Sequence, residues 1–119
     1  YKGEIEYVDS FYMGEPADFY ARLKELPKDA DKVLIVAHNP GLEALLQQLD
    51  GHVDTLPTGA LALLKLDLKN WIYLDMATSG EMIAFFCLDY FSQLNICLFK
   101  VRTNFNRSLM QTTMWIFNF

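Results

Sequence analysis

His38 is the residue whose type and setting most favour chemistry. It follows the apolar run Val33–Ala37 and precedes an Asn-Pro-Gly sequence. In open α/β sheets, ligands bind beyond the carboxyl ends of parallel strands, and a helix that starts there points free N–H groups at an anion. We therefore expect the imidazole of His38 and the N–H groups of Asn39 and Gly41 to converge on one phosphate-sized anion.

A histidine in this position has two interpretations. Its pKa range near neutrality suits general acid–base chemistry or the binding of a phosphate. A histidine at the end of a strand can equally be a structural residue with satisfied hydrogen bonds, and the residues alone leave both roles open. The other histidine, His52, stands beside Gly51 in an apparent turn and is interpreted as an exposed loop residue.

The sequence predicts neither a metal site nor a cofactor. Neither histidine has a carboxylate at the spacing of metal ligands, and Cys87 and Cys97 lack the His or Cys neighbours of a zinc site. No Gly-rich phosphate loop or nucleophile-elbow pattern occurs. Two cysteines do not make a disulfide framework, so we interpret them as reduced thiols of a cytoplasmic protein.

The elements around the first histidine follow from the hydrophobic pattern. The β-branched run Val33–Ala37 predicts a strand buried on both faces of a parallel sheet. Leucines at helical spacing between residues 42 and 49 predict an amphipathic helix. Asn39 is expected to be its N-cap, with Pro40 at the first helical position and Gly51 at its end.

The rest of the body predicts an α/β fold. Apolar residues at helical spacing predict a helix of about three turns from Pro16 to Pro27. Strands are expected over Ala60–Leu68 and Met82–Leu88, with a weaker strand signal at Glu4–Val8. This order of elements predicts an α/β sheet with a mixed edge.

Charge divides the chain into two parts. Residues 1–93 contain seven basic and all fifteen acidic residues, a net charge of −8, whereas residues 94–119 contain three basic residues and no acid. An acidic body argues against nucleic-acid binding, because phosphate backbones require a basic face. The longest apolar runs are far shorter than the roughly 20 residues of a membrane span, so we expect no membrane partner.

The aromatic-basic tail, residues 94–119, does not continue the pattern of the body. Its aromatic residues show no clean period of 2 or 3.6. Three accounts compete: an added strand or helix, an aromatic-basic surface segment, or out-of-frame or read-through sequence. The change in charge and the loss of periodicity favour the last account. We therefore expect residues 1–93 to form the domain, and the tail to be poorly ordered or to pack opportunistically.

The order of motifs resembles the histidine phosphatase superfamily, the phosphoglycerate-mutase-like fold, in its SixA-type form. The segment Val33–Leu42 is similar to the family's second-histidine segment, and Leu56–Ala60 with the strand after it is similar to the strand that comes next. The resemblance covers about residues 3–90. Further elements in family order are Phe11-Tyr12, Leu23–Pro27, Trp71 and Ser79-Gly80.

This resemblance implies a two-step phosphoryl transfer. A nucleophilic histidine in an Arg-His-Gly-like motif, at the end of the family's first strand, takes the phosphoryl group, and water then releases it. The second histidine, which matches His38, and two arginines hold the phosphoryl oxygens. SixA-type members act on phosphohistidine in signalling proteins, and relatives act on small phosphate esters. The implied partner is therefore a phosphorylated protein or a small phosphate ester.

The sequence departs from the family pattern in its phosphate pocket. The first strand, the Arg-His motif and the first helix would all precede Tyr1, and no Arg-His pair occurs anywhere. At Tyr12-Met13, where mutase-like relatives place a proton-donating carboxylate, no acid is present. Only His38 carries over with its family role. The arginines that match no family arginine are Arg22, Arg102 and Arg107.

The implied fold is a partial phosphoglycerate-mutase-like three-layer sandwich that lacks the N-terminal strands and the nucleophile segment. The implied function is that of a phosphohistidine or phosphomonoester phosphatase whose chemistry belongs to the complete chain. The alternative is a catalytically silent module that binds phosphate or a protein. Because the missing strands lie beside the His38 strand in the family, we expect self-association through an exposed sheet edge unless the tail covers the gap.

Overall fold

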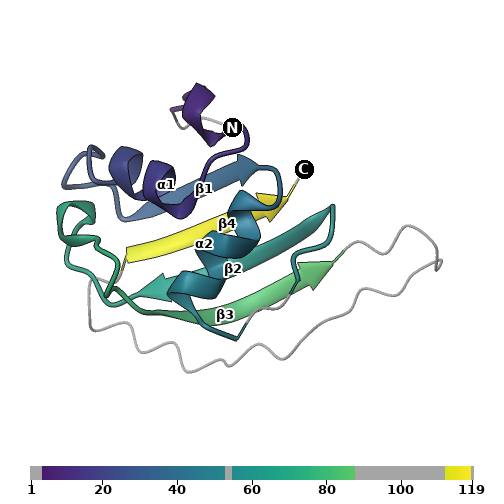
Figure 1. Cartoon of the computed structure of the whole chain (residues 1–119). Helices are drawn as coiled ribbons and strands as arrows, with labels where there is room; N and C mark the ends of the chain where they lie inside the picture. Colours follow the sequence, from purple (N-terminus) through teal and green to yellow (C-terminus); the bar gives the residue numbers. More distant parts are fainter. Residues whose placement is uncertain (1–3, 53–54, 88–111, 119) are drawn as a thin grey trace.

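The computed structural model describes residues 4–52, 55–87 and 112–118, which form two layers (Figure 1). One layer is a four-stranded mixed sheet of order β1-β4-β2-β3, and the other consists of two α-helices on one face of that sheet. The expectation of an α/β fold with a mixed sheet is confirmed. The elements are α1 (Pro16–Leu23), β1 (Lys32–Ala37), α2 (Gly41–Leu49), β2 (Ala60–Leu66), β3 (Gly80–Cys87) and β4 (Thr112–Asn118), with short 3-10 helices at Asp9–Phe11 and Trp71–Tyr73.

Strand directions in the sheet are mixed. β1 pairs with β4 in parallel, from Lys32 opposite Thr113 to Ala37 opposite Asn118. β2 lies between β4 and β3 and is antiparallel to both. The two parallel strands, β1 and β4, therefore end at the same edge of the sheet.

Helix α1 is shorter than the sequence pattern predicts. It ends at Leu23, about one turn before Pro27. The N–H groups of Glu25 and Leu26 donate to carbonyls three residues earlier, those of Arg22 and Leu23. Such bonds tighten a helix end, and a residue that precedes a proline is disfavoured in the α region. Apolar residues at helical spacing therefore continue beyond Leu23, where the α-helix ends.

Helix α2 carries the predicted apolar face. Leu42, Leu45, Leu46 and Leu49 are all buried against the sheet. Gly51 follows with φ of 74°, the left-handed conformation that the sequence predicts after this helix. On the other side of the same core, alternate residues of the strands point inward. They are Ile35 and Ala37 of β1, Ala60, Ala62, Leu64 and Leu66 of β2, and Met114 and Ile116 of β4.

The expectation that the strand before His38 is buried on both faces is wrong. β1 is an edge strand of the described sheet, and it is buried on one face only. Leu34 is 58% exposed and Val36 is 52% exposed. The reason is that both described helices lie on the opposite face, so the second apolar face of β1 has no helix of the described ranges against it.

Residues 112–118 follow one of the accounts of the tail that we did not favour, an added strand. These residues form β4, which lies inside the sheet between β1 and β2. Met114 and Ile116 are fully buried in the core. β4 thus lies beside β1, the strand that ends before His38. The remaining tail residues, Cys97 included, lie outside the described residues.

Candidate functional site

His38 lies where the sequence predicts, directly beyond the carboxyl end of a parallel strand. β1 ends at Ala37, and His38 follows it with an exposed side chain. β4 ends at Asn118, which is in register with Ala37, so both parallel strands reach this edge. An exposed imidazole at the end of parallel strands can meet a ligand from solvent, and it can act as an acid, a base or an anion ligand.

The ring of Tyr12 lies beside His38. The two ring centroids are 6.4 Å apart and the ring planes meet at 86°, an edge-to-face arrangement. Pairs with this separation and angle are favoured by the ring quadrupoles. Tyr12 is itself 75% exposed. The contact restricts the orientation of the His38 imidazole. No local sequence pattern predicts it.

Gly41 allows the turn that contains Tyr12 and Gly14 to pack closely against the start of α2. Gly41 is buried, and a Cβ at this position would lie 2.1 Å from the carbonyl oxygen of Gly14. Two backbone segments can approach this closely only where a side chain is absent. The Gly14 to Gly41 contact therefore holds the turn that carries Tyr12 against the end of β1, next to His38.

Asn39 does not have the capping role that the sequence predicts. The N-cap of α2 is Pro40, whose carbonyl accepts the first helical hydrogen bond from Ala44 at 3.1 Å. The side-chain Nδ2 of Asn39 instead donates to Glu43 Oε1 at 2.9 Å and to the carbonyl of Leu56 at 2.7 Å. The amide group thus points into the body, and its Oδ1 is buried without a hydrogen-bond partner in the described part of the chain.

A cluster of polar groups around the Leu56 peptide holds the residues next to His38 in place. Glu43 Oε1 also accepts the N–H of Leu56 at 2.8 Å, and Asn118 Nδ2 donates to the carbonyl of Leu56 at 2.7 Å. The cluster joins the first turn of α2, the segment before β2 and the end of β4. Its members are far apart in the sequence, and no local pattern predicts that they meet. These hydrogen bonds hold α2, the helix that follows His38, in position.

The other histidine lies at the far end of α2. His52 Nδ1 is 2.7 Å from the carbonyl oxygen of Asp50, and its side chain is exposed, as the sequence predicts. Nine helical residues separate it from the start of α2, a length of about 13 Å at 1.5 Å per residue. His52 and His38 therefore do not share a site. β4 ends at Asn118, which is in register with Ala37, the residue before His38.

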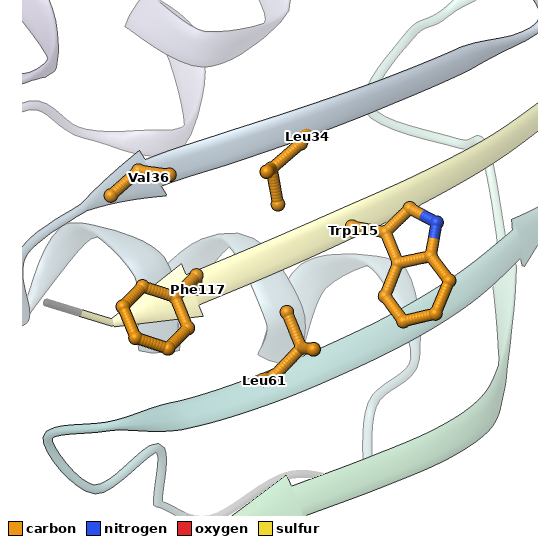
Figure 2. A pocket seen from close by; sticks show the side chains of 5 residues that line it. All are labelled: Leu34, Val36, Leu61, Trp115 and Phe117. Atoms are coloured by element: carbon orange, nitrogen blue, oxygen red, sulfur yellow. The ribbon is translucent and has the colours of Figure 1, made fainter. Parts of the chain in front are cut away.

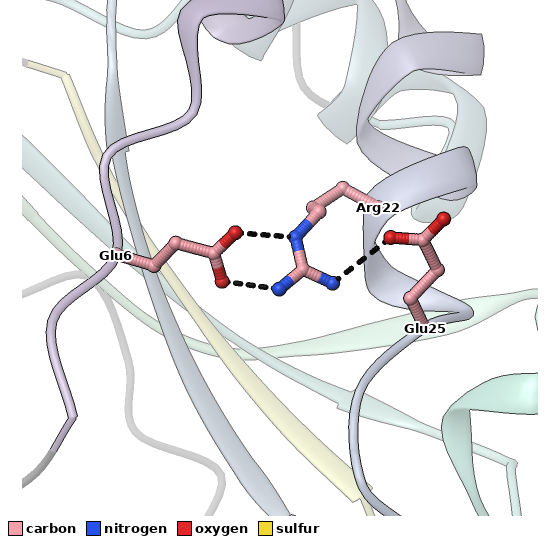
Figure 3. Close-up of polar contacts among 3 residues, drawn as sticks. All are labelled: Glu6, Arg22 and Glu25. Atoms are coloured by element: carbon pink, nitrogen blue, oxygen red, sulfur yellow. Dashed lines mark hydrogen bonds and ion pairs between the residues drawn. The ribbon is translucent and has the colours of Figure 1, made fainter.

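Arg22, the one arginine among the described residues, is held by carboxylates (Figure 3). Its Nε donates to Glu6 at 2.7 Å, a second guanidinium nitrogen binds the other oxygen of Glu6, and a third contacts Glu25 at 3.2 Å. The hydrogen bond to Arg22 lowers the pKa of the Glu6 carboxyl and raises that of the guanidinium. The Arg22–Glu6 ion pair attaches the N-terminal segment to α1. This segment, residues 4–8, is expected from its sequence to be a weak strand, but it pairs with no strand of the described sheet.

Other chemistry is limited in the described ranges. Within them, no group of three or more His, Cys, Asp or Glu side chains could hold a metal ion. Cys87 is a half-buried free thiol. No helix of residues 4–52, 55–87 and 112–118 has the length and apolar character to span a bilayer.

Comparisons with models of protein families, with curated proteins and with solved structures find no match to this chain. Its function is therefore inferred from the residues around His38 and from the resemblance of the sequence motifs.

Proposed function

We propose that His38 is the second active-site histidine of a histidine-phosphatase-type site, and that its ligand is a phosphorylated protein side chain or a small phosphate ester. The position of His38 supports this proposal. It is the first residue beyond β1, at the edge where β1 and β4 both end, and three residues before α2 begins at Gly41. A phosphate there would meet the imidazole and the positive end of the helix dipole.

The proposed role of the chain by itself is phosphate binding. Covalent phosphoryl transfer in this family needs a nucleophilic histidine close to the second one. His52 is the only other histidine of the sequence, and it lies beyond the far end of α2. Phosphohistidine or phosphomonoester hydrolysis would then require an Arg-His-Gly-like segment that residues 1–119 do not contain.

Binding is tested by titrating the isotopically labelled protein with inorganic phosphate and following backbone amide resonances. We expect saturable shifts at His38, Asn39 and Gly41, because the proposal places the anion next to these three residues. The His38→Ala variant should lose these shifts, since it lacks the imidazole. The His52→Ala variant is the matched control and should keep them. Equal shifts in both variants would mean that the anion binds elsewhere.

Activity is tested with a phosphohistidine substrate and a generic aryl phosphate. We expect no turnover above that of His38→Ala, because oxyanion stabilisers without a nucleophile leave only residual catalysis. Turnover that depends on His38 would contradict this expectation and would identify another residue as the nucleophile.

The alternative function is a catalytically silent module that binds a phosphorylated partner. The end of β4 favours it, because the strand next to β1 ends at Asn118, not at a histidine, and the Asn118 side-chain amide donates to the Leu56 carbonyl. The two functions share the binding step and differ in the nucleophile. An in-frame Arg-His-Gly-like segment in the genomic sequence upstream of Tyr1 would favour the phosphatase, and its absence would favour the silent module.

A further inference from the structure

The strand register places apolar side chains of all four strands on the face of the sheet opposite the two helices. These side chains form two rows that cross the sheet. The first row is Leu34, Trp115, Leu63 and Ala84, and the second is Val36, Phe117, Leu61 and Phe86. We call these eight residues the open face.

Seven of the eight residues of the open face are at least partly exposed, and the eighth, Ala84, is 6% exposed. Leu34 is 58% exposed and Val36 is 52% exposed, whereas Ile35 between them is 3% exposed. Trp115 and Phe117 are half-buried, and their rings stand out from the same side of the sheet as Leu34, Val36 and Leu61 (Figure 2). These five side chains line a shallow apolar hollow. Contiguous exposed apolar patches are characteristic of surfaces that bind another protein segment.

The width of the open face fits one helix. Four strands about 4.8 Å apart span about 14 Å from β1 to β3. A single α-helix is about 10–12 Å across and covers most of this width when it lies along β4. The described helices cannot be donated by a second copy, because the apolar faces of α1 and α2 are buried in the core.

Charged residues border the open face at one end. Lys32 and Lys65 lie on the same side of the sheet as the two apolar rows, in the register row that also contains Glu81. This row carries a net charge of +1 on a chain whose net charge is −5. A docked segment gains from a carboxylate placed over the two lysines. The ligand that fits is apolar along one side and acidic at one end.

We propose that the open face is the docking site for one amphipathic helix of a partner protein. The apolar stripe of that helix covers the two rows of the open face, with Trp115 and Phe117 as the central anchors. Its acidic end lies over Lys32 and Lys65. This interaction is independent of phosphate binding, because His38 lies at the edge of the sheet beyond β1 and outside both rows.

The test uses a synthetic amphipathic peptide of about 18 residues, or five turns, with a leucine stripe and glutamates at one end. A peptide of identical composition in shuffled order is its control. Binding is followed by the fluorescence of Trp115 and its protection from acrylamide. The only other tryptophan, Trp71, is fully buried and gives a constant background. We expect the amphipathic peptide to bind at least about tenfold more tightly than the shuffled one, a difference of about 1.4 kcal/mol.

Matched variants locate the binding surface. Leu34→Asp should weaken binding about tenfold or more, the scale for an interface anchor. Ile72→Asp, at a site that is 56% exposed but not on the open face, should leave binding unchanged. Lys65→Glu should weaken binding of the glutamate-ended peptide and strengthen that of a lysine-ended one. Val36→Lys replaces Leu34→Asp if the latter does not fold, and circular dichroism checks each variant.

Four results would overturn the proposal. Equal affinities for the amphipathic and shuffled peptides would mean that the face does not recognise a helix. Equal effects of Leu34→Asp and Ile72→Asp would place binding elsewhere. A peptide-free dimer in sedimentation that Leu34→Asp converts to monomer would assign the face to a second copy. A peptide-free monomer in which Trp115 is as protected as Trp71 would show that this chain covers the face itself.

Discussion

Tyr20 is a buried phenol on α1 whose hydroxyl group has no hydrogen-bond partner among the described residues. Its side chain is 5% exposed. A buried polar group without a partner costs free energy, because it gives up hydrogen bonds to water on folding. Replacing Tyr20 with phenylalanine should therefore leave the free energy of unfolding unchanged or raise it by up to about 1 kcal/mol. Urea unfolding at neutral pH measures this change, with Tyr73→Phe at an exposed site as the control.

The same residue predicts a pH dependence. Burial, and secondarily the negative charge of Asp75, raises the pKa of Tyr20 above its ordinary value of 10.0. The folded protein thus holds the phenolic proton more tightly than the unfolded chain, and ionisation favours unfolding. The stabilisation is complete below about pH 10 and is lost as pH rises from there through the raised pKa. Thermal unfolding at pH 8 and pH 11 should therefore show a smaller alkaline loss in Tyr20→Phe than in the original protein; equal losses would contradict this assignment.

The roles of residues near His38 can be predicted from the sequence only where a pattern of a few neighbouring residues determines them. The position of His38 after a strand, and of Gly41 at the start of a helix, follows from hydrophobic runs and from Pro and Gly, which act over a few residues. The hydrogen bonds of Asn39 to Glu43 and Leu56 depend on the packing of α2 against the segment before β2. An asparagine at this position does not by itself show whether its side chain caps the helix or points into the body.

Strand β4 lies inside the sheet and contributes to the core. Its inward residues, Met114 and Ile116, are fully buried between β1 and β2. Ile116→Ala should lower the free energy of unfolding by about 2–5 kcal/mol, the range for truncating a buried aliphatic side chain. Val36→Ala, on the exposed side of the neighbouring strand, is the control and should cost less than about 1 kcal/mol. Urea unfolding measures both, and similar losses would mean that residues 112–118 do not form part of the core.

The sequence hides β4 for a physical reason. A half-buried strand is recognised by the alternation of apolar and polar residues. In β4 the residues facing the core, Met114 and Ile116, alternate with Trp115 and Phe117 on the open face, so both sides are apolar and the period of 2 has no contrast. β1 and α2, in contrast, are predicted well, because a β-branched run and a leucine pattern are both local signals. The exposed side of β1 does not follow from the residues of this strand, since it depends on which face the helices cover.

At the scale of the whole molecule, the strand order ties distant parts of the chain together. β1 has β4 as its only strand partner in the described sheet, and β2 with β3 reaches β1 only through β4. The last described element thus closes the sheet between the first two strands. Pairing over such long sequence separations is slow, because the loop must close before the contacts form. We therefore regard β4 as the element on which cooperative folding depends.

A chain that ends at residue 111 tests this dependence. It should lose cooperative unfolding, because without β4 the strand β1 has no partner and core residues such as Ile35 and Leu64 lose the neighbours that bury them. Circular dichroism during urea unfolding measures the transition. Adding a synthetic peptide of residues 112–119 should restore it, whereas a shuffled peptide of the same composition should not. If the shortened chain unfolds with an unchanged midpoint, residues 4–87 fold without β4, and the strand is an addition to a sheet that is stable without it.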